Sequence, residues 1–189
     1  MEEKEIIALI ADVEALDEDK DTTLEYLTAL KARDMERVKW FLSFGKDARH
    51  AVMNVHEYRK AMFFGLEHTG FDEYGWITYM DFPHVEEVSF ALPKERFGNN
   101  ITLHRSPNGK WVYGADWRYG EGGRGWGGSV FDKPFASREA CLNHAIKEMQ
   151  KYFEGILKSK RSKQDVSYIQ RVMKMVSEKM PDKVQLELF

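Results

Sequence analysis

The sequence predicts an α+β protein in which helices and strands occupy separate parts of the chain. Apolar residues recur at helical spacing in the first 70 residues and again after Ser137. Between these regions, β-type runs are separated by turn sequences such as Asn108-Gly109. This segregation favours an α+β fold over a doubly wound sheet. We expect an N-terminal three-helix unit, a central antiparallel sheet of four to five strands, two C-terminal helices and a short extended tail.

The N-terminal unit, residues 1–70, is expected to hold three helices. Apolar side chains at helical spacing form the stripe of the first helix, up to Leu16. The second is expected to begin at Thr22, which has capping-box spacing to the glutamate three residues later, and to run to Gly45. Asp47 is a suitable N-cap for the third, which is expected to continue to about the end of the unit.

Residues 71–180 are expected to form the sheet and the two C-terminal helices, either as a separate domain or as one continuous domain with residues 1–70. Ser137 can cap a long helix, which the basic run at 158–163 interrupts, and a last helix follows at about 165–179. The expected strands are residues 76–80, 88–92, 101–105, 110–119 and 129–131.

Composition limits the class of protein. With 189 residues, 43% of them hydrophobic, the chain can bury a substantial core. The net charge of -3 argues against a wholly basic protein, but residues 158–163 hold four basic residues and no acid, whereas residues 1–21 hold nine acids and two lysines. The sequence predicts no signal peptide and has no apolar run of about 18 residues. We therefore expect a cytoplasmic protein with no membrane partner.

No catalytic signature is present, and we expect neither an enzyme nor a cofactor. Gly120, Gly122 and Gly125 have dinucleotide-binding spacing, but that motif requires a following helix, and a strand is expected here instead. Cys141, the single cysteine, excludes a disulfide within the chain and is expected to be a small residue of the core or of its flank. No metal site is expected, because the neighbouring residues Asp81, His84, Glu86 and Glu87 lack an accompanying metal-ligand framework.

The glycine-rich stretch, residues 119–128, is expected to be a mobile loop. As a binding loop it would offer the rings of Trp117, Tyr119 and Trp126 to the bases of a nucleic acid, and Arg124 to its phosphates. The alternative is a structural hairpin loop in which Trp117 and Tyr119 only cover the sheet.

A basic elbow between the two C-terminal helices consists of Lys158, Lys160, Arg161 and Lys163. These cations are suited to contact phosphates, in which case binding would weaken as salt rises. They equally fit a solvated helix end, where positive charge is favourable. DNA or RNA is therefore the alternative partner that the sequence indicates.

The segment 181–189 is expected to form a peptide tail, because Pro181 disfavours continuation of the last helix. Its last five residues are Gln185-Leu186-Glu187-Leu188-Phe189, and this pattern resembles the bacterial sliding-clamp-binding motif, Gln-Leu-small or acidic-Leu-Phe. The resemblance implies that Leu188 and Phe189 fill the main apolar pocket of the clamp, that Gln185 contacts its rim, and that Leu186 occupies a shallower site. The alternative is an edge strand, because apolar and polar residues alternate from Val184.

The body resembles small phage- and plasmid-encoded proteins of unknown function in three elements: the hairpin at Asn108-Gly109-Lys110-Trp111, the glycines that follow it, and the helix start Ser137-Arg138-Glu139-Ala140. This resemblance implies an origin in a mobile element and no particular chemistry.

We therefore expect a phage- or plasmid-type accessory or inhibitory protein that docks on the sliding clamp through its C-terminal peptide. A nucleic-acid-binding module is one alternative. A helical protein-interaction module is another, and it would expose Phe41, Phe44, Phe63 and Phe64 as a patch.

Overall fold

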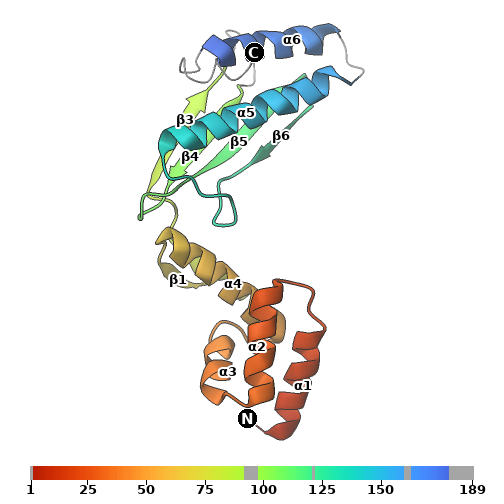
Figure 1. Cartoon of the computed structure of the whole chain (residues 1–189), viewed down its shortest axis with the longest axis vertical. Helices are drawn as coiled ribbons and strands as arrows, with labels where there is room; N and C mark the ends of the chain where they lie inside the picture. Colours follow the sequence, from red (N-terminus) through yellow and green to blue (C-terminus); the bar gives the residue numbers. More distant parts are fainter. Residues whose placement is uncertain (1, 92–97, 121, 160–162, 179–189) are drawn as a thin grey trace. The chain divides into compact units, whose positions relative to one another are not determined.

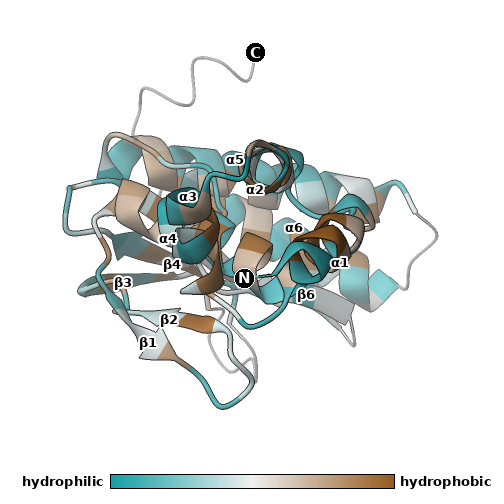
Figure 2. Ribbon diagram, turned by 90° about the horizontal axis from the view of Figure 1, so that it is seen from below, coloured by the Kyte–Doolittle hydropathy of each residue, from teal (hydrophilic) through white to brown (hydrophobic). Residues whose placement is uncertain are grey.

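The computed structural model describes residues 2–91, 98–120, 122–159 and 163–178. The chain forms two compact units, the first ending at Asp81 and the second beginning at Phe82. Each unit combines helices with antiparallel strands, so the predicted α+β fold is confirmed. In the view coloured by hydropathy, the helices carry both hydrophilic and hydrophobic segments, as amphipathic helices over a core do (Figure 2).

The first unit contains four helices and a two-stranded hairpin (Figure 1). The helices are α1 (Glu3–Glu14), α2 (Lys20–Ala32), α3 (Met35–Leu42) and α4 (Ala48–Phe64), and the hairpin pairs β1 (His68–Phe71) with β2 (Ile77–Tyr79). The buried side chains of α1 to α4 form one apolar core, and β2 adds Ile77 to it. Because Ile77 packs in this core, the hairpin belongs with the helices, and the boundary falls after Asp81 and not after residue 70.

The prediction of a single helix from Thr22 to Gly45 is wrong, because this stretch forms two helices, α2 and α3. Arg33 adopts the left-handed conformation (φ 55°, ψ 34°), which ends α2. Asp34 then caps α3 by accepting a hydrogen bond from a backbone N–H three residues later, at 3.0 Å. The N-cap of α2 is Asp19, whose carboxylate accepts a hydrogen bond from the N–H of Thr22 at 3.0 Å.

Helix α4 begins as predicted but ends earlier. The carboxylate of Asp47 accepts a hydrogen bond from the N–H of His50 at 2.9 Å and so caps the helix. At the other end, Gly65 takes a φ of 73° and terminates it after Phe64. A residue with a side chain is disfavoured in this conformation, so the glycine sets the helix end and lets the chain turn into β1.

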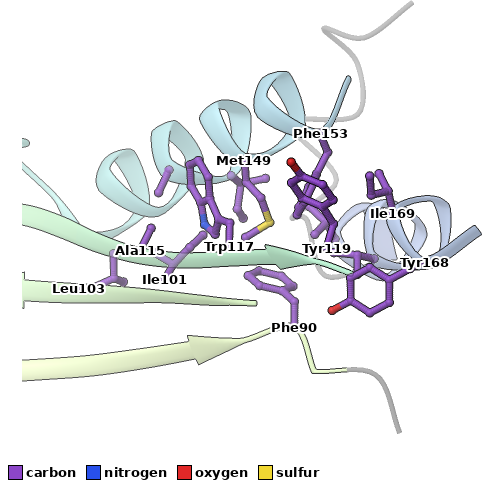
Figure 3. Packing of buried hydrophobic residues seen from close by; sticks show 14 of the residues in the cluster. Phe90, Ile101, Leu103, Ala115, Trp117, Tyr119, Met149, Phe153, Tyr168 and Ile169 are labelled. Carbon is purple, nitrogen blue, oxygen red and sulfur yellow. The ribbon is translucent and has the colours of Figure 1, made fainter. Parts of the chain in front are cut away.

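The second unit is a four-stranded antiparallel sheet with two helices packed on it. The strands β3 (His84–Ser89), β4 (Asn100–Arg105), β5 (Trp111–Tyr119) and β6 (Gly122–Trp126) lie in the order β3-β4-β5-β6. Helix α5 (Arg138–Leu157), which Ser137 caps as predicted, lies along the sheet with α6 (Lys163–Glu178) beside it (Figure 1). The core between sheet and helices buries Phe90, Trp117, Met149 and Phe153 (Figure 3).

Two strand predictions in this unit are confirmed and one is wrong. The expected strands 101–105 and 110–119 correspond to β4 and β5, and the turn between them contains Gly109 with a φ of 82°. Residues 129–131 form no strand. The fourth strand of the sheet, β6, comes instead from the glycine-rich stretch that was expected to be a loop.

The glycines of β6 allow it to lie very close to its neighbours. A Cβ atom at Gly123 would lie 2.5 Å from the backbone oxygen of Trp117, and one at Gly122 would lie 2.6 Å from the ring of Tyr119. Real side chains do not tolerate such distances, so these glycines permit close backbone packing. Their role in the fold is therefore structural.

Candidate functional site

The predicted clamp-binding residues Gln185, Leu186, Leu188 and Phe189 lie outside the described residues. So do Lys160 and Arg161 of the basic elbow. The roles assigned to these six residues stay predictions. The remaining predicted site residues all belong to the second unit: Trp117, Tyr119, Arg124, Trp126, Lys158 and Lys163.

Trp117 and Tyr119 are core residues. Their exposed fractions are 0% and 8%, and both pack with α5 and α6 side chains in the cluster drawn in Figure 3. A ring that stacks on a nucleic-acid base must present one face to solvent. In this structure the two rings are covered by protein, which agrees with the alternative in which they only pack on the sheet.

Arg124 lies over three aromatic rings. Its guanidinium carbon is 4.5 Å from the ring centroid of Trp117, 4.8 Å from that of Trp126 and 4.7 Å from that of Tyr152 on α5. We call Trp117, Arg124, Trp126 and Tyr152 the arginine cluster. Contacts of this kind are worth about 0.5–2 kcal/mol each, depending on burial. The cluster therefore fastens β6 to β5 and α5.

The arginine cluster is also compatible with contact to an anionic ligand. Arg124 is exposed, although three rings surround its guanidinium group. A guanidinium stacked on rings keeps its N–H groups in its own plane, where they can still meet a phosphate or carboxylate. Trp126, which is partly buried, has its ring 5.1 Å from that of Trp117 in an edge-on contact. The site therefore offers an anion contact but no free stacking platform on Trp117.

The two described lysines of the basic elbow are exposed. Lys158 is the C-cap of α5, and Lys163 is the first residue of α6. Lys158 follows Tyr152 by six residues, which corresponds to about 9 Å along the helix axis. Lys158 therefore lies at the end of the helix that contributes Tyr152 to the arginine cluster, within about two turns of that residue.

Glu86 and Cys141 have structural roles in the second unit. Glu86 on β3 accepts a hydrogen bond from Nε of Arg138 at 2.7 Å, which ties the sheet to the start of α5. Within the described ranges, no group of three or more His, Cys, Asp or Glu side chains is arranged to hold a metal ion. Cys141 is fully buried, and burial raises the pKa of its thiol to about 12, which disfavours the thiolate near neutral pH.

The four phenylalanines proposed for a helical interaction surface do not form an exposed patch. Phe41, Phe44 and Phe64 are buried, whereas Phe63 is 51% exposed. A single exposed phenylalanine is ordinary on a protein surface. This observation argues against a helical interaction surface built from these four side chains.

The structure also contains a cavity in the first unit that sequence reasoning missed. The hairpin cavity has a volume of about 560 Å³, which is in the range of small-ligand sites. One wall is the connection from α3 to α4, and the other is the turn between β1 and β2. Its lining residues are Leu42, Ser43, Phe44, Gly45, Lys46, Asp47, His50, Phe71, Asp72, Glu73, Tyr74 and Gly75.

Asn54 on α4 holds the two walls together. It is fully buried, and its Nδ2 donates to the carbonyl oxygens of Phe44 at 2.6 Å and Gly75 at 2.8 Å. Its Oδ1 accepts a hydrogen bond from the N–H of Ile77 at 3.0 Å. One side chain thus satisfies three backbone groups from both walls, which gives the cavity a defined shape.

Asp47 and His50 form a pair at the edge of the hairpin cavity. One carboxylate oxygen of Asp47 lies 2.6 Å from Nδ1 of His50, and the His50 ring packs on Trp76 with centroids 4.3 Å apart. Partial burial opposes ionisation of Asp47, but hydrogen bonds from the backbone and ring of His50 outweigh it and lower the pKa of that carboxyl. The sequence predicts Asp47 as a helix cap. No local pattern around it indicates that the turn between β1 and β2 lies across the cavity from it.

Comparison with family models, with curated proteins and with solved structures finds no match for this chain. Among the helices in the described ranges, none has the length and apolarity that crossing a membrane requires.

Proposed function

We propose that this chain is a phage- or plasmid-type accessory or inhibitory protein that docks on the bacterial DNA sliding clamp through residues 185–189. The observation that carries the proposal is the sequence Gln185-Leu186-Glu187-Leu188-Phe189, which matches the clamp-binding pattern at every position. Two leucines and a phenylalanine supply the few apolar anchors from which short linear peptides gain their affinity.

The distance between the second unit and the motif gives docking a physical consequence. Helix α6 ends at Glu178, and six residues separate it from Gln185. A chain extends at most about 3.6 Å per residue, so the Cα atoms of Glu178 and Gln185 are no more than about 25 Å apart. A docked peptide would hold the second unit near the clamp surface. There the unit would obstruct other clamp-bound proteins, or bring its own surface towards DNA.

Binding of the full chain to purified bacterial sliding clamp tests the proposal. We expect the Leu188→Ala, Phe189→Ala double variant to bind at least about tenfold more weakly, because both main anchors are removed. The Asp182→Ala, Lys183→Ala variant changes two residues of the same segment outside the motif and should bind like the unmodified chain. Equal binding by the unmodified chain and the Leu188/Phe189 variant, or no binding by either, would end the proposal.

Competition distinguishes use of the expected pocket from contact elsewhere on the clamp. A synthetic peptide of residues 181–189 should displace the full chain, and so should any other peptide that carries the clamp-binding pattern. A peptide with alanine at positions 188 and 189 should not. If neither active peptide displaces the chain, the motif is not the docking element.

A nucleic-acid-binding function remains the second candidate, and exposed Arg124 favours it. Since Trp117 and Tyr119 are core residues, this function now depends on Arg124, Trp126 and the basic elbow. It predicts oligonucleotide binding that weakens steeply with salt. Binding by the Arg124→Gln variant that equals that of the unmodified chain would remove Arg124 from this role.

A further inference from the structure

The hairpin cavity has features of a preformed binding site, independent of the proposed clamp docking. Its two walls come from segments 42–50 and 71–75, and the three hydrogen bonds of buried Asn54 hold them in place. A site that does not have to be assembled avoids part of the entropic cost of binding. Walls held in this way need less ordering when a side chain binds.

The charge of the lining is mainly negative. Asp47, Asp72 and Glu73 contribute three carboxylates, and Lys46 is the one ammonium group of the lining. Oδ1 of Asp72 accepts hydrogen bonds from the backbone N–H groups of Tyr74 and Trp76, at 2.9 and 2.8 Å, which fixes this carboxylate at the rim. The lining is thus complementary to a cation.

Two exposed aromatic residues line the same cavity as these carboxylates. Tyr74 is 71% exposed and Phe71 is 43% exposed, both in the hairpin and both on the cavity lining. Exposed rings next to carboxylates form the combination that a planar cation requires, because the ring faces attract its charge and the carboxylates accept its N–H groups.

His50 contributes an imidazole ring to the lining. When Nδ1–H donates to Asp47, the neutral ring carries its lone pair on Nε2. Among the described residues, Nε2 of His50 has no hydrogen-bond partner. This atom lies on the side of Gly75, since a Cβ atom there would be 3.7 Å from it. A ligand with N–H donors would satisfy it.

We propose that the hairpin cavity binds the guanidinium group of an arginine side chain presented by a partner protein. A guanidinium group has several N–H donors in one plane, so it pairs with carboxylates and with Nε2 of His50 while stacking on Phe71 or Tyr74. A lysine ammonium pairs with carboxylates but lacks the planar face, and it binds more weakly. An anion is disfavoured, because it meets three carboxylates and only one ammonium group.

Titration of the ¹⁵N-labelled full chain with a capped Gly-Ser-Arg-Ser-Gly peptide tests the proposal. We expect saturable shifts of backbone amide signals in segments 42–50 and 71–75, with a dissociation constant on the order of millimolar for a single anchoring side chain. The same peptide with citrulline in place of arginine is the matched probe, because it keeps the shape and loses the charge. It should produce no saturable shifts, and the lysine peptide should bind more weakly than arginine.

Two variants locate the binding. Glu73→Gln should weaken arginine-peptide binding about fivefold, and Glu36→Gln, a change at another exposed glutamate, on α3, should leave it unchanged. Tyr74→Ala should also weaken binding. Glu73 and Tyr74 are exposed, so neither substitution should disturb the fold, and the amide spectrum of each variant verifies this. Equal binding of the arginine and citrulline peptides, equal effects of Glu73→Gln and Glu36→Gln, or absence of shifts in both segments would overturn the proposal.

Discussion

The guanidinium carbon of Arg124 lies 4.5 Å from the ring centroid of Trp117, directly across the ladder between β5 and β6. The two residues are register partners, so the contact is a cross-strand pair. Three of the five residues of β6 are glycines, so the strand has few side chains that can pack on its neighbours. The contact of Arg124 with Trp117 compensates for this lack of side-chain packing. The exposed arginine thus covers a tryptophan that is fully buried.

Removal of this contact should loosen β6. We expect Arg124→Gln to lower the free energy of unfolding by about 1 kcal/mol, because the cation is lost while most of the side-chain length remains. The free energy of unfolding of Arg124→Lys should lie between those of the unmodified chain and Arg124→Gln. Chemical denaturation followed by tryptophan fluorescence measures the change, with Lys151→Gln on α5 as the charge-removal control. An effect of Arg124→Gln no larger than that of the control would show that the stacking contributes nothing.

Two glycines near β6 should respond differently to the same substitution. In Gly123→Ala the new methyl group would meet the backbone oxygen of Trp117 at 2.5 Å, so the strand must shift. Nothing lies within 4 Å of the corresponding position at Gly127. We expect Gly123→Ala to destabilise the protein by about 1–3 kcal/mol and Gly127→Ala to be nearly neutral. Similar thermal midpoints for both variants would contradict the close packing of β6.

Asn54 should be among the most sensitive positions of the first unit. Asn54→Ala leaves two carbonyl groups and one N–H without their buried partner. We expect a loss of about 2–4 kcal/mol in the free energy of unfolding. Lys39→Ala, an exposed change on α3, should have little effect. Hydrogen exchange at the N–H of Ile77 gives a local readout, which should accelerate in the Asn54 variant alone.

The ion-pair network of Glu25 should make stability depend on pH. Arg37 and Arg59 both pair with this carboxylate, the latter at 2.6 Å. Partial burial opposes ionisation, but the hydrogen bonds and charges of the two arginines outweigh it and hold the pKa of Glu25 below its ordinary value of 4.5. Because the folded pKa is the lower one, the stabilisation is present above pH 4.5 and is lost as the pH falls through the folded pKa.

Glu25→Gln measures this contribution. The side chain is about one-third exposed, so solvent screening should limit the loss at neutral pH to roughly 1 kcal/mol. The difference in unfolding free energy between Glu25→Gln and the unmodified chain should shrink as the pH falls below 4.5. A difference that stays constant down to acid pH would mean that the network does not stabilise the charged carboxylate.

Cys141 should be unreactive in the folded protein. Burial raises the pKa of its thiol to about 12, and nearby Asp132 adds to the effect. We expect a thiol reagent to leave it unmodified between about pH 7 and pH 9, where an ordinary cysteine becomes increasingly reactive. In denaturant the thiol should react completely. Rapid modification of the native chain would show that this part of the core opens readily.

Local sequence was a reliable guide at the N-termini of α4 and α5. Asp47 and Ser137 cap their helices as predicted, because a short acceptor before an apolar stripe is enough to satisfy a free N–H group. The break between α2 and α3 was missed, because apolar spacing continues through Arg33 and Asp34. No glycine or proline marks this break, and an arginine takes the left-handed position.

The sequence by itself determined the α+β class, the N-caps of α4 and α5 and the β4–β5 hairpin, since these follow from spacing and from local hydrogen bonds. Tertiary structure alone decided that Trp117 and Tyr119 are core residues and that Arg124 lies over a ring. An exposed and a buried strand face have the same alternation, and only the packing of α5 and α6 distinguishes them. The hairpin cavity likewise arises where two distant segments meet on Asn54, a relationship that no local pattern encodes.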